Sequence, residues 1–125
     1  MPSVAIVGAS TDRSKFGNKA VRAFRDKGYT VYPINPKEAE VEGIKAYRSI
    51  LDVPTDHLDM VSVYLPPQVG MKVIEDIAKK NCDEVWLNPG AESDELVAKG
   101  EQLGLTMIAA CSIVGIGSSP GQFSG

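Results

Sequence analysis

The chain has little cysteine and histidine, and it lacks a long apolar run. Its two cysteines, Cys82 and Cys111, are too few for a disulfide scaffold and lack CxxC spacing, and its one histidine, His57, argues against a metal cluster. No run of about 18 apolar residues is available to span a bilayer, and no basic N-terminal region precedes an apolar stretch. We therefore expect a cytoplasmic protein with no metal and no membrane segment.

A basic surface is also missing. The 13 lysines and arginines are outnumbered by 16 acidic residues, which leaves a net charge of −3 and argues against nucleic-acid binding. A length of 125 residues with 43% hydrophobic residues fits one domain. We expect that domain to cover residues 1–125, with the segment 111–125, which is rich in glycine and serine, as an irregular tail.

Short apolar runs alternate with segments of helical periodicity along the chain. The predicted strands are residues 4–7, 30–34, 60–65, 84–87 and 105–110. The predicted helices are one capped by Ser14 and ended near Gly28, one from Pro67 to about Lys80, and one from Asp94 to Leu103. Residues 37–55 show a weak pattern, with a turn at Gly43 and at most a short helix near residues 49–51. This order predicts a Rossmann-like, doubly wound α/β domain with a mainly parallel five-stranded sheet.

Small and polar residues follow four of the predicted strands. In a doubly wound sheet, ligands bind at the carboxyl ends of the strands, so these loops are the candidate site. Gly8 allows a close approach of the backbone, and a helix starting near Ser14 and Lys15 offers N–H groups to a pyrophosphate. The loop is not a GxGxxG fingerprint, because the glycine after Gly8 is Gly17.

The loop after the second strand separates the candidate cofactors. An NAD site places an acidic residue there to bind the ribose hydroxyls, whereas this chain has Asn35 followed by Lys37. An amide and a cation suit a phosphorylated ribose, which both coenzyme A (CoA) and NADP carry. The alternative is that Lys37 is an ordinary solvated lysine.

Five motifs in the same order resemble a known family. They are residues 4–10, residues 31–37, the pair Pro66 and Pro67, residues 85–90, and Cys111. Together they closely resemble the small stand-alone CoA-binding proteins, which are similar to the N-terminal domain of the succinyl-CoA synthetase α subunit. The resemblance implies that the chain binds CoA or an acyl-CoA with the adenine nucleotide over residues 10–13. It also implies that Lys37 approaches a phosphate and that residues 65–66 and 87–89 wall the groove. The chain departs from the family at residues 112–117, where a charged or histidine-bearing stretch is common, and at Asn88, where glutamine is common.

The candidate residues are those of the four loops and the start of the first helix. The predicted cofactor-binding residues are Gly8, Ser10, Thr11, Asp12, Arg13, Ser14, Lys15, Asn35, Pro36, Lys37, Leu65, Pro66, Pro67, Leu87, Asn88 and Pro89. No Ser/His/Asp set is recognisable, so we predict binding without catalysis.

Three other side chains have two interpretations each. Cys111 follows the last strand, where it either faces the cleft and forms a mixed disulfide with CoA or packs as a small apolar side chain. Trp86 belongs to the core or lines the groove, and Cys82, expected at the end of a helix, is structural.

Two other functions remain open from the sequence. One is an NADP-binding oxidoreductase fragment, which the missing GxGxxG and the lack of a substrate domain disfavour. The other is a regulatory module with a vestigial cleft, whose surface and glycine-rich tail bind a protein partner.

Overall fold

Five parallel strands form the sheet of this protein, which we describe from a computed structural model covering residues 1–124. In chain order the strands are β1 (Ser3–Val7), β2 (Thr30–Ile34), β5 (Leu58–Val63), β6 (Cys82–Leu87) and β7 (Met107–Ala109). Their order across the sheet is β2-β1-β5-β6-β7, and every neighbouring pair is parallel. The chain winds outward from β1 to β2, then returns to the other side of β1, so the switch point lies between β1 and β5. The predicted doubly wound α/β fold is confirmed.

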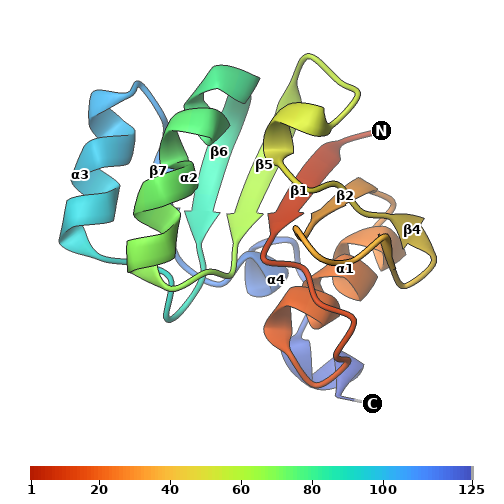
Figure 1. Ribbon diagram of the computed structural model, residues 1–125. Coiled ribbons are helices and arrows are strands. Elements are labelled where there is room, and N and C mark those ends of the chain that lie inside the picture. The colour runs from red at the N-terminus through yellow and green to blue at the C-terminus, as the bar shows by residue number, and fades with distance from the viewer. Residues whose placement is uncertain (125) are drawn as a thin grey trace.

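Helices cover both faces of the sheet (Figure 1). They are α1 (Phe16–Asp26), α2 (Pro67–Lys80), α3 (Asp94–Gln102) and the short α4 (Ser112–Gly115), with 3₁₀ turns η1 (Ile50–Asp52) and η2 (Pro120–Phe123). Alternate residues of β1 point to opposite faces: Ala5 and Val7 pack in the cluster with α2 and α3, whereas Val4 and Ile6 pack in the cluster with α1 and α4. Both faces are therefore covered, which explains why the central strand β1 is apolar without a break from Val4 to Val7.

The sequence located the elements well, and the differences lie at their ends. Strand β7 covers only residues 107–109 of the predicted 105–110, and β5 ends at Val63 rather than at residue 65. Helix α2 has the predicted bounds, whereas α1 begins at Phe16 after an N-cap, Lys15, whose side chain makes no capping hydrogen bond. Strand β5 begins at Leu58, earlier than predicted. Cys82 begins β6 rather than ending a helix, because α2 stops at Lys80 and Asn81 turns the chain with a φ of 67°.

A small hairpin occupies part of the weakly patterned region. Strands β3 (Glu40–Val41) and β4 (Ile44–Lys45) are antiparallel, and the two residues between them, Glu42 and Gly43, both have positive φ. Such a two-residue turn is the common connection of a tight hairpin. The turn expected at Gly43 is present, but strands of two residues are too short to show periodicity in the sequence.

The segment after β7 is ordered where the sequence predicted an irregular tail. It forms α4 and η2 within residues 111–124. Ile113 is fully buried, and Ile116 and Phe123 pack against the core beneath α1. Burial of these apolar side chains against α1 is the physical reason for the difference.

A buried amide joins three separate parts of the chain. The Nδ2 of Asn88 donates to Ser62 Oγ and to the Val63 carbonyl oxygen, both at 2.9 Å. Its Oδ1 accepts from the Ser112 backbone N–H at 2.8 Å and from the Ser112 hydroxyl at 3.0 Å. Asn88 thereby ties the ends of β5 and β6 to α4, and all three polar side chains are buried with their hydrogen bonds made.

We expect Asn88→Ala to lower the free energy of unfolding by about 2–3 kcal/mol, because it leaves the buried Ser112 N–H without its acceptor and removes one hydrogen bond from each of the Ser62 and Ser112 hydroxyls. Urea denaturation measures the change. The control is Gln102→Ala, which removes an exposed amide and should cost under about 0.5 kcal/mol. Equal stability of the two variants would contradict a structural role for the Asn88 amide.

Candidate functional site

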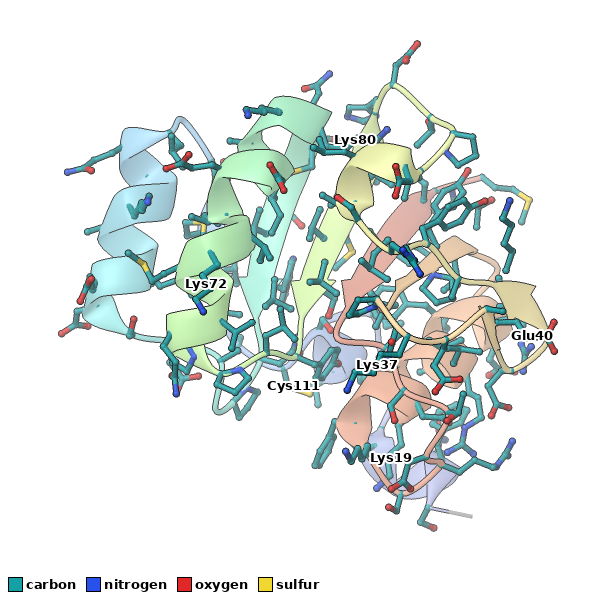
Figure 2. All side chains as sticks on the ribbon, in the orientation of Figure 1. Lys19, Lys37, Glu40, Lys72, Lys80 and Cys111 are labelled. Carbon is teal, nitrogen blue, oxygen red and sulfur yellow. The ribbon has the colours of Figure 1, made fainter. Side chains whose placement is uncertain are left out.

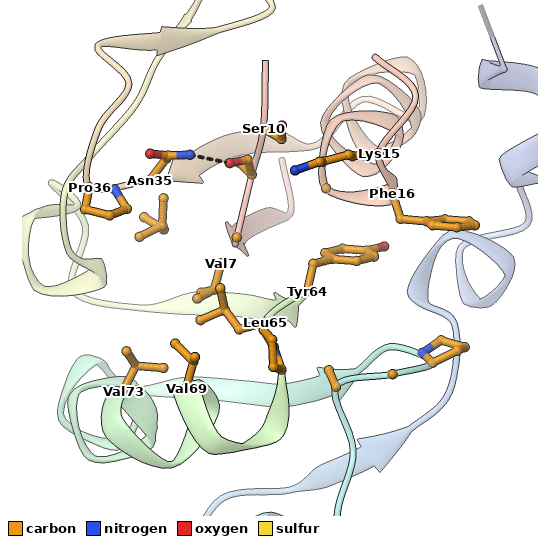
Figure 3. A pocket seen from close by; sticks show the side chains of 18 of the residues that line it. Val7, Ser10, Lys15, Phe16, Asn35, Pro36, Tyr64, Leu65, Val69 and Val73 are labelled. Carbon is orange, nitrogen blue, oxygen red and sulfur yellow. Dashed lines mark hydrogen bonds between the residues drawn. The ribbon is translucent and has the colours of Figure 1, made fainter. Parts of the chain in front are cut away.

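A groove of about 900 Å³ runs along the carboxyl edge of the sheet, between the loops after β1 and β2 and those after β5 and β6 (Figure 3). This is the switch point, where ligands bind in doubly wound folds. The groove is lined by Val7, Gly8, Ala9, Ser10, Ser14, Lys15, Phe16, Gly17, Ile34, Asn35, Pro36, Arg48, Tyr64, Leu65, Pro66, Val69, Val73, Pro89, Gly90 and Ala91.

Two glycines bring the start of α1 against the end of β1. Gly8 has a φ of 94°, and a side chain at Gly17 would place its Cβ 2.2 Å from the Gly8 carbonyl oxygen. The N–H groups of Gly8 and Ala9 both donate to the Ile34 carbonyl oxygen at 3.2 Å. The turn between β1 and α1 therefore lies close against the end of β2 as well.

The N-terminus of α1 opens into the groove. Lys15, Phe16 and Gly17 line it, and no side chain caps this end of the helix. The first N–H groups of a helix lack partners within it and carry partial positive charge, so they attract anions. The Lys15 ammonium points from this end of α1 across the groove, toward the loop that holds Asn35 (Figure 3). The arrangement suits a phosphate group.

The loop before α1 is held by its own hydroxyl groups. The Asp12 N–H donates to Ser10 Oγ at 3.0 Å, and the Ser14 N–H and hydroxyl donate to Asp12 Oδ1 at 3.0 and 2.6 Å. These bonds from Ser14 lower the pKa of the Asp12 carboxyl group. The carboxylate of Asp12 is thus used inside the loop and does not line the groove.

The outer side of the same loop is bound by the β3–β4 hairpin. Arg13 donates to Glu42 Oε1 at 2.6 Å, and Asn18 Nδ2 donates to Glu42 Oε2 at 3.0 Å and to the Ser10 carbonyl oxygen at 2.9 Å. The hydrogen bond from Asn18, followed by the charge of Arg13, lowers the pKa of Glu42 against the opposing effect of burial. The Arg13 guanidinium is therefore bound on the outer side of the loop, at the hairpin.

Asn35 connects the first two loops. Its Nδ2 donates to the Ala9 carbonyl oxygen at 2.8 Å, the bond drawn in Figure 3, and its Oδ1 accepts from the N–H groups of Lys37 and Glu38 at 2.7 and 3.2 Å. This turn directs the chain away after Pro36. Figure 2 shows Lys37 near the edge of the sheet that carries the groove, but Lys37 is not among the residues that line the groove.

The structure brings one part of the predicted set together. The predicted residues that line the groove are Gly8, Ser10, Ser14, Lys15, Asn35, Pro36, Leu65, Pro66 and Pro89. Those that lie outside its lining are Thr11, Asp12, Arg13, Lys37, Pro67, Leu87 and Asn88. Leu87 belongs to the core and the Asn88 amide to the buried network, because the side chains of both turn into the protein at the end of β6.

Sequence reasoning missed an apolar wall and one cation. Val69 and Val73 line the groove from the first two turns of α2. Arg48 lies in the weakly patterned region, where no sequence signal pointed to a site. Tyr64 follows β5 directly, and burial raises the pKa of its phenol to about 12, so the phenol stays protonated.

The side chains with two interpretations pack outside the groove lining. Cys111 is half-buried and packs with Trp86 against the core cluster of α1. Gly115 of α4 sits so close to Trp86 that an added Cβ would lie 2.6 Å from the indole ring, which places Trp86 in the core. Figure 2 shows Cys111 near the carboxyl edge of the sheet, but it does not line the groove.

A polar cluster lies at the opposite edge of the sheet, at the amino ends of β5 and β6. Ligand atoms of His57, Asp59 and Asp83 are all within 4.8 Å of one another. His57 Nε2 is 2.8 Å from Asp83 Oδ1, and Asp59 Oδ2 accepts from the Ser3 N–H at 2.7 Å. The hydrogen bond to Asp83 raises the pKa of His57. The cluster is therefore an exposed ion pair beside a carboxylate that anchors β1.

Fold and groove together define a Rossmann-like α/β domain whose first helix opens its N-terminus into a groove at the switch point of the sheet. A comparison with protein-family models identifies the family to which this domain belongs. The chain belongs to the CoA-binding domain family, whose model matches residues 2–117. No helix among residues 1–124 has the length and apolar character needed to cross a membrane.

The relatives include large ligases and small proteins. An ADP-forming acetate–CoA ligase of Methanocaldococcus jannaschii is 44% identical over 78 residues, which are 62% of this chain and 11% of the ligase. This chain spans about a tenth to a fifth of the length of such ligases. The uncharacterized protein YneT of Bacillus subtilis is 26% identical over 105 residues, which are 84% of this chain and 77% of YneT.

Solved structures show the same two groups. A conserved hypothetical protein of Pyrococcus furiosus superposes with a TM-score of 0.84 and 34% identity, over 92% of this chain and 99% of that one. The acetyl-coenzyme A synthetase 1 of Candidatus Korarchaeum cryptofilum, solved with phosphate and ADP, gives a TM-score of 0.75 and 30% identity, over 86% of this chain and 25% of that one. The predicted resemblance to CoA-binding proteins is confirmed.

We expect Gly17→Ala to lower the free energy of unfolding by about 1–3 kcal/mol, because the added methyl meets the Gly8 backbone, which cannot rotate away as a side chain does. Urea denaturation measures the loss. Gly121→Ala is the control, since its Cβ meets only Ser119 Oγ at 3.6 Å. If the two variants are equally stable, the packing of α1 on the β1 turn is looser than described.

The His57–Asp83 pair predicts a pH dependence. Because the pKa of His57 is raised in the folded protein, the pair stabilises fully below the unfolded pKa of about 6.5 and loses this contribution as pH rises through the folded pKa. NMR titration of the imidazole should give a pKa above the ordinary value in the wild type and a lower one in Asp83→Asn. An unchanged pKa in the variant would exclude the ion pair in solution.

Proposed function

We propose that the groove binds coenzyme A or an acyl-CoA and holds it without performing chemistry of its own. The observation that carries the proposal is the uncapped N-terminus of α1, which opens with Lys15 into a groove at the switch point of the sheet. A pyrophosphate bound there receives backbone N–H groups, the positive end of the helix dipole and an ammonium group. Membership of the CoA-binding domain family supports the same ligand.

The opposite wall suits the uncharged parts of the ligand. Leu65, from the loop after β5, and Val69 and Val73, from α2, line that side of the groove. Apolar walls with a few polar groups are the usual composition of a cofactor site. Three prolines in the lining, Pro36, Pro66 and Pro89, fix the loops that carry them and reduce the entropy lost when a ligand binds.

The lining also supports binding rather than catalysis. Among the residues that line the groove there is no carboxylate, imidazole or thiol. A general base or a covalent nucleophile is most often drawn from those groups. The Tyr64 phenol, with its pKa raised to about 12 by burial, is a poor base at neutral pH. We therefore propose that the chain presents CoA to a partner protein or domain.

The proposal includes a cytoplasmic location. Both cysteines are free thiols, which persist in a reducing compartment.

Calorimetric titration with CoA, 3′-dephospho-CoA, NADP and NAD tests the ligand. We expect CoA to bind most tightly and NAD to bind weakly, because NAD lacks the additional phosphate and the groove lining has no acidic residue for its ribose hydroxyls. Lys15→Ala should weaken CoA binding about tenfold by removing a charge at the pyrophosphate.

The matched control is Lys79→Ala, which removes an exposed cation from the last turn of α2 and should leave binding unchanged. Absence of CoA binding to the wild type would reject the ligand and favour a vestigial cleft. In that case, capture of the same protein partner by wild type and Lys37→Glu would support the interaction module.

A further inference from the structure

Arg48 lines the groove from a segment that does not belong to any of the five strands. An isolated parallel bridge pairs Tyr47 with Ile34 of β2. The Tyr47 N–H donates to the Pro33 carbonyl oxygen, and its carbonyl oxygen accepts from the Asn35 N–H, both at 2.9 Å. Residues 46–48 therefore extend the sheet by one short parallel pairing. Parallel chains end on the same edge, so Arg48 emerges beside Asn35 at the groove.

The backbone on either side of Arg48 is fixed. Tyr47 is bonded to β2 through both of its peptide groups, and its ring lies 6.1 Å from that of Tyr32. On the other side, Ser49 caps η1 by accepting from the Leu51 N–H at 3.1 Å. The arginine thus extends from a rigid base, which reduces the ordering needed when its side chain binds a ligand.

The Arg48 side chain has no protein partner within residues 1–124, since it forms no hydrogen bond, ion pair or ring contact there. Other arginines differ: Arg13 and Arg25 both contact Glu42 of the hairpin. Arg48 and Lys15 are the cations among the lining residues, and that lining contains no carboxylate to neutralise them.

These two cations stand on different elements. Lys15 belongs to the start of α1, where a pyrophosphate receives the helix N–H groups, whereas Arg48 stands beside Asn35 at the end of β2. A ligand with two separate phosphate groups can satisfy both cations at once. CoA has a pyrophosphate and a 3′-phosphate on its ribose, whereas 3′-dephospho-CoA has only the first. A guanidinium group binds a phosphate monoester through two parallel hydrogen bonds.

On the basis of the proposed function, we propose that Arg48 binds the ribose 3′-phosphate and makes the groove specific for CoA over 3′-dephospho-CoA. In this proposal Arg48 takes the phosphate-binding role that the sequence suggested for Lys37. The lysine stands beyond the turn made by Asn35 and does not line the groove.

The test is a cycle in which both the residue and the phosphate are removed. Wild type, Arg48→Gln and Lys37→Gln are each titrated with CoA and with 3′-dephospho-CoA. We expect wild type to bind CoA about 10- to 100-fold more tightly than 3′-dephospho-CoA. Arg48→Gln should bind CoA weakly and should bind 3′-dephospho-CoA with the affinity of wild type. Lys37→Gln should keep the preference of wild type for CoA. Unchanged binding of 3′-dephospho-CoA shows that Arg48→Gln is folded with an intact groove.

Each other result overturns the inference. If Arg48→Gln weakens the binding of both ligands equally, the arginine contributes only its positive charge to the groove and does not recognise the 3′-phosphate. Loss of the preference in Lys37→Gln alone assigns the phosphate to the lysine. If wild type binds both ligands equally, the groove is not specific for the 3′-phosphate, and the inference fails while the proposed function stands. Failure of wild type to bind either ligand rejects the proposed function together with the inference.

Discussion

The close approach of α1 to the end of β1 is the constraint on which the site depends. Because Gly17 has no side chain, the first turn of the helix rests on the Gly8 carbonyl oxygen. The helix axis is thereby aimed at the carboxyl edge of the sheet, and its first N–H groups meet the groove. A larger residue would move this helix end outward and separate the positive end of the helix dipole from the groove.

Side-chain amides hold the loops around that contact. Asn35 joins the loop after β2 to the Ala9 carbonyl oxygen, and Asn18 joins α1 to the Ser10 carbonyl oxygen. Asn88 joins the other half of the sheet to α4. Amides suit this task because they donate and accept without a charge whose burial would cost free energy. The groove is therefore bounded by fixed backbone on both sides, and a ligand meets it largely preformed.

The sequence was informative where burial imposes a pattern. The central strand β1 is apolar from Val4 to Val7 because it is covered on both faces, and α2 repeats its apolar residues at helical spacing, so both were located closely. The hairpin at residues 40–45 and the turns after β7 are too short for a period, and tertiary packing of Ile113 and Phe123 orders the latter. For the site, the loops were located but side-chain directions were not: Asn88 turns inward, and Arg48 reaches the groove through a single bridge.

The distribution of charge explains how an acidic protein keeps carboxylates out of its groove. The chain carries a net charge of −3, yet the groove lining contains cations and no carboxylate. Glu42 lies outside the groove, where it binds Arg13 and Arg25, and Asp12 is turned into its own loop by Ser14. The acidic residues near the β1–α1 loop are thus paired with partners that keep them away from the lining. A phosphate in the groove meets a local positive field, and this field sets its affinity more than the net charge does, since exposed charges beyond about 10 Å are screened by salt.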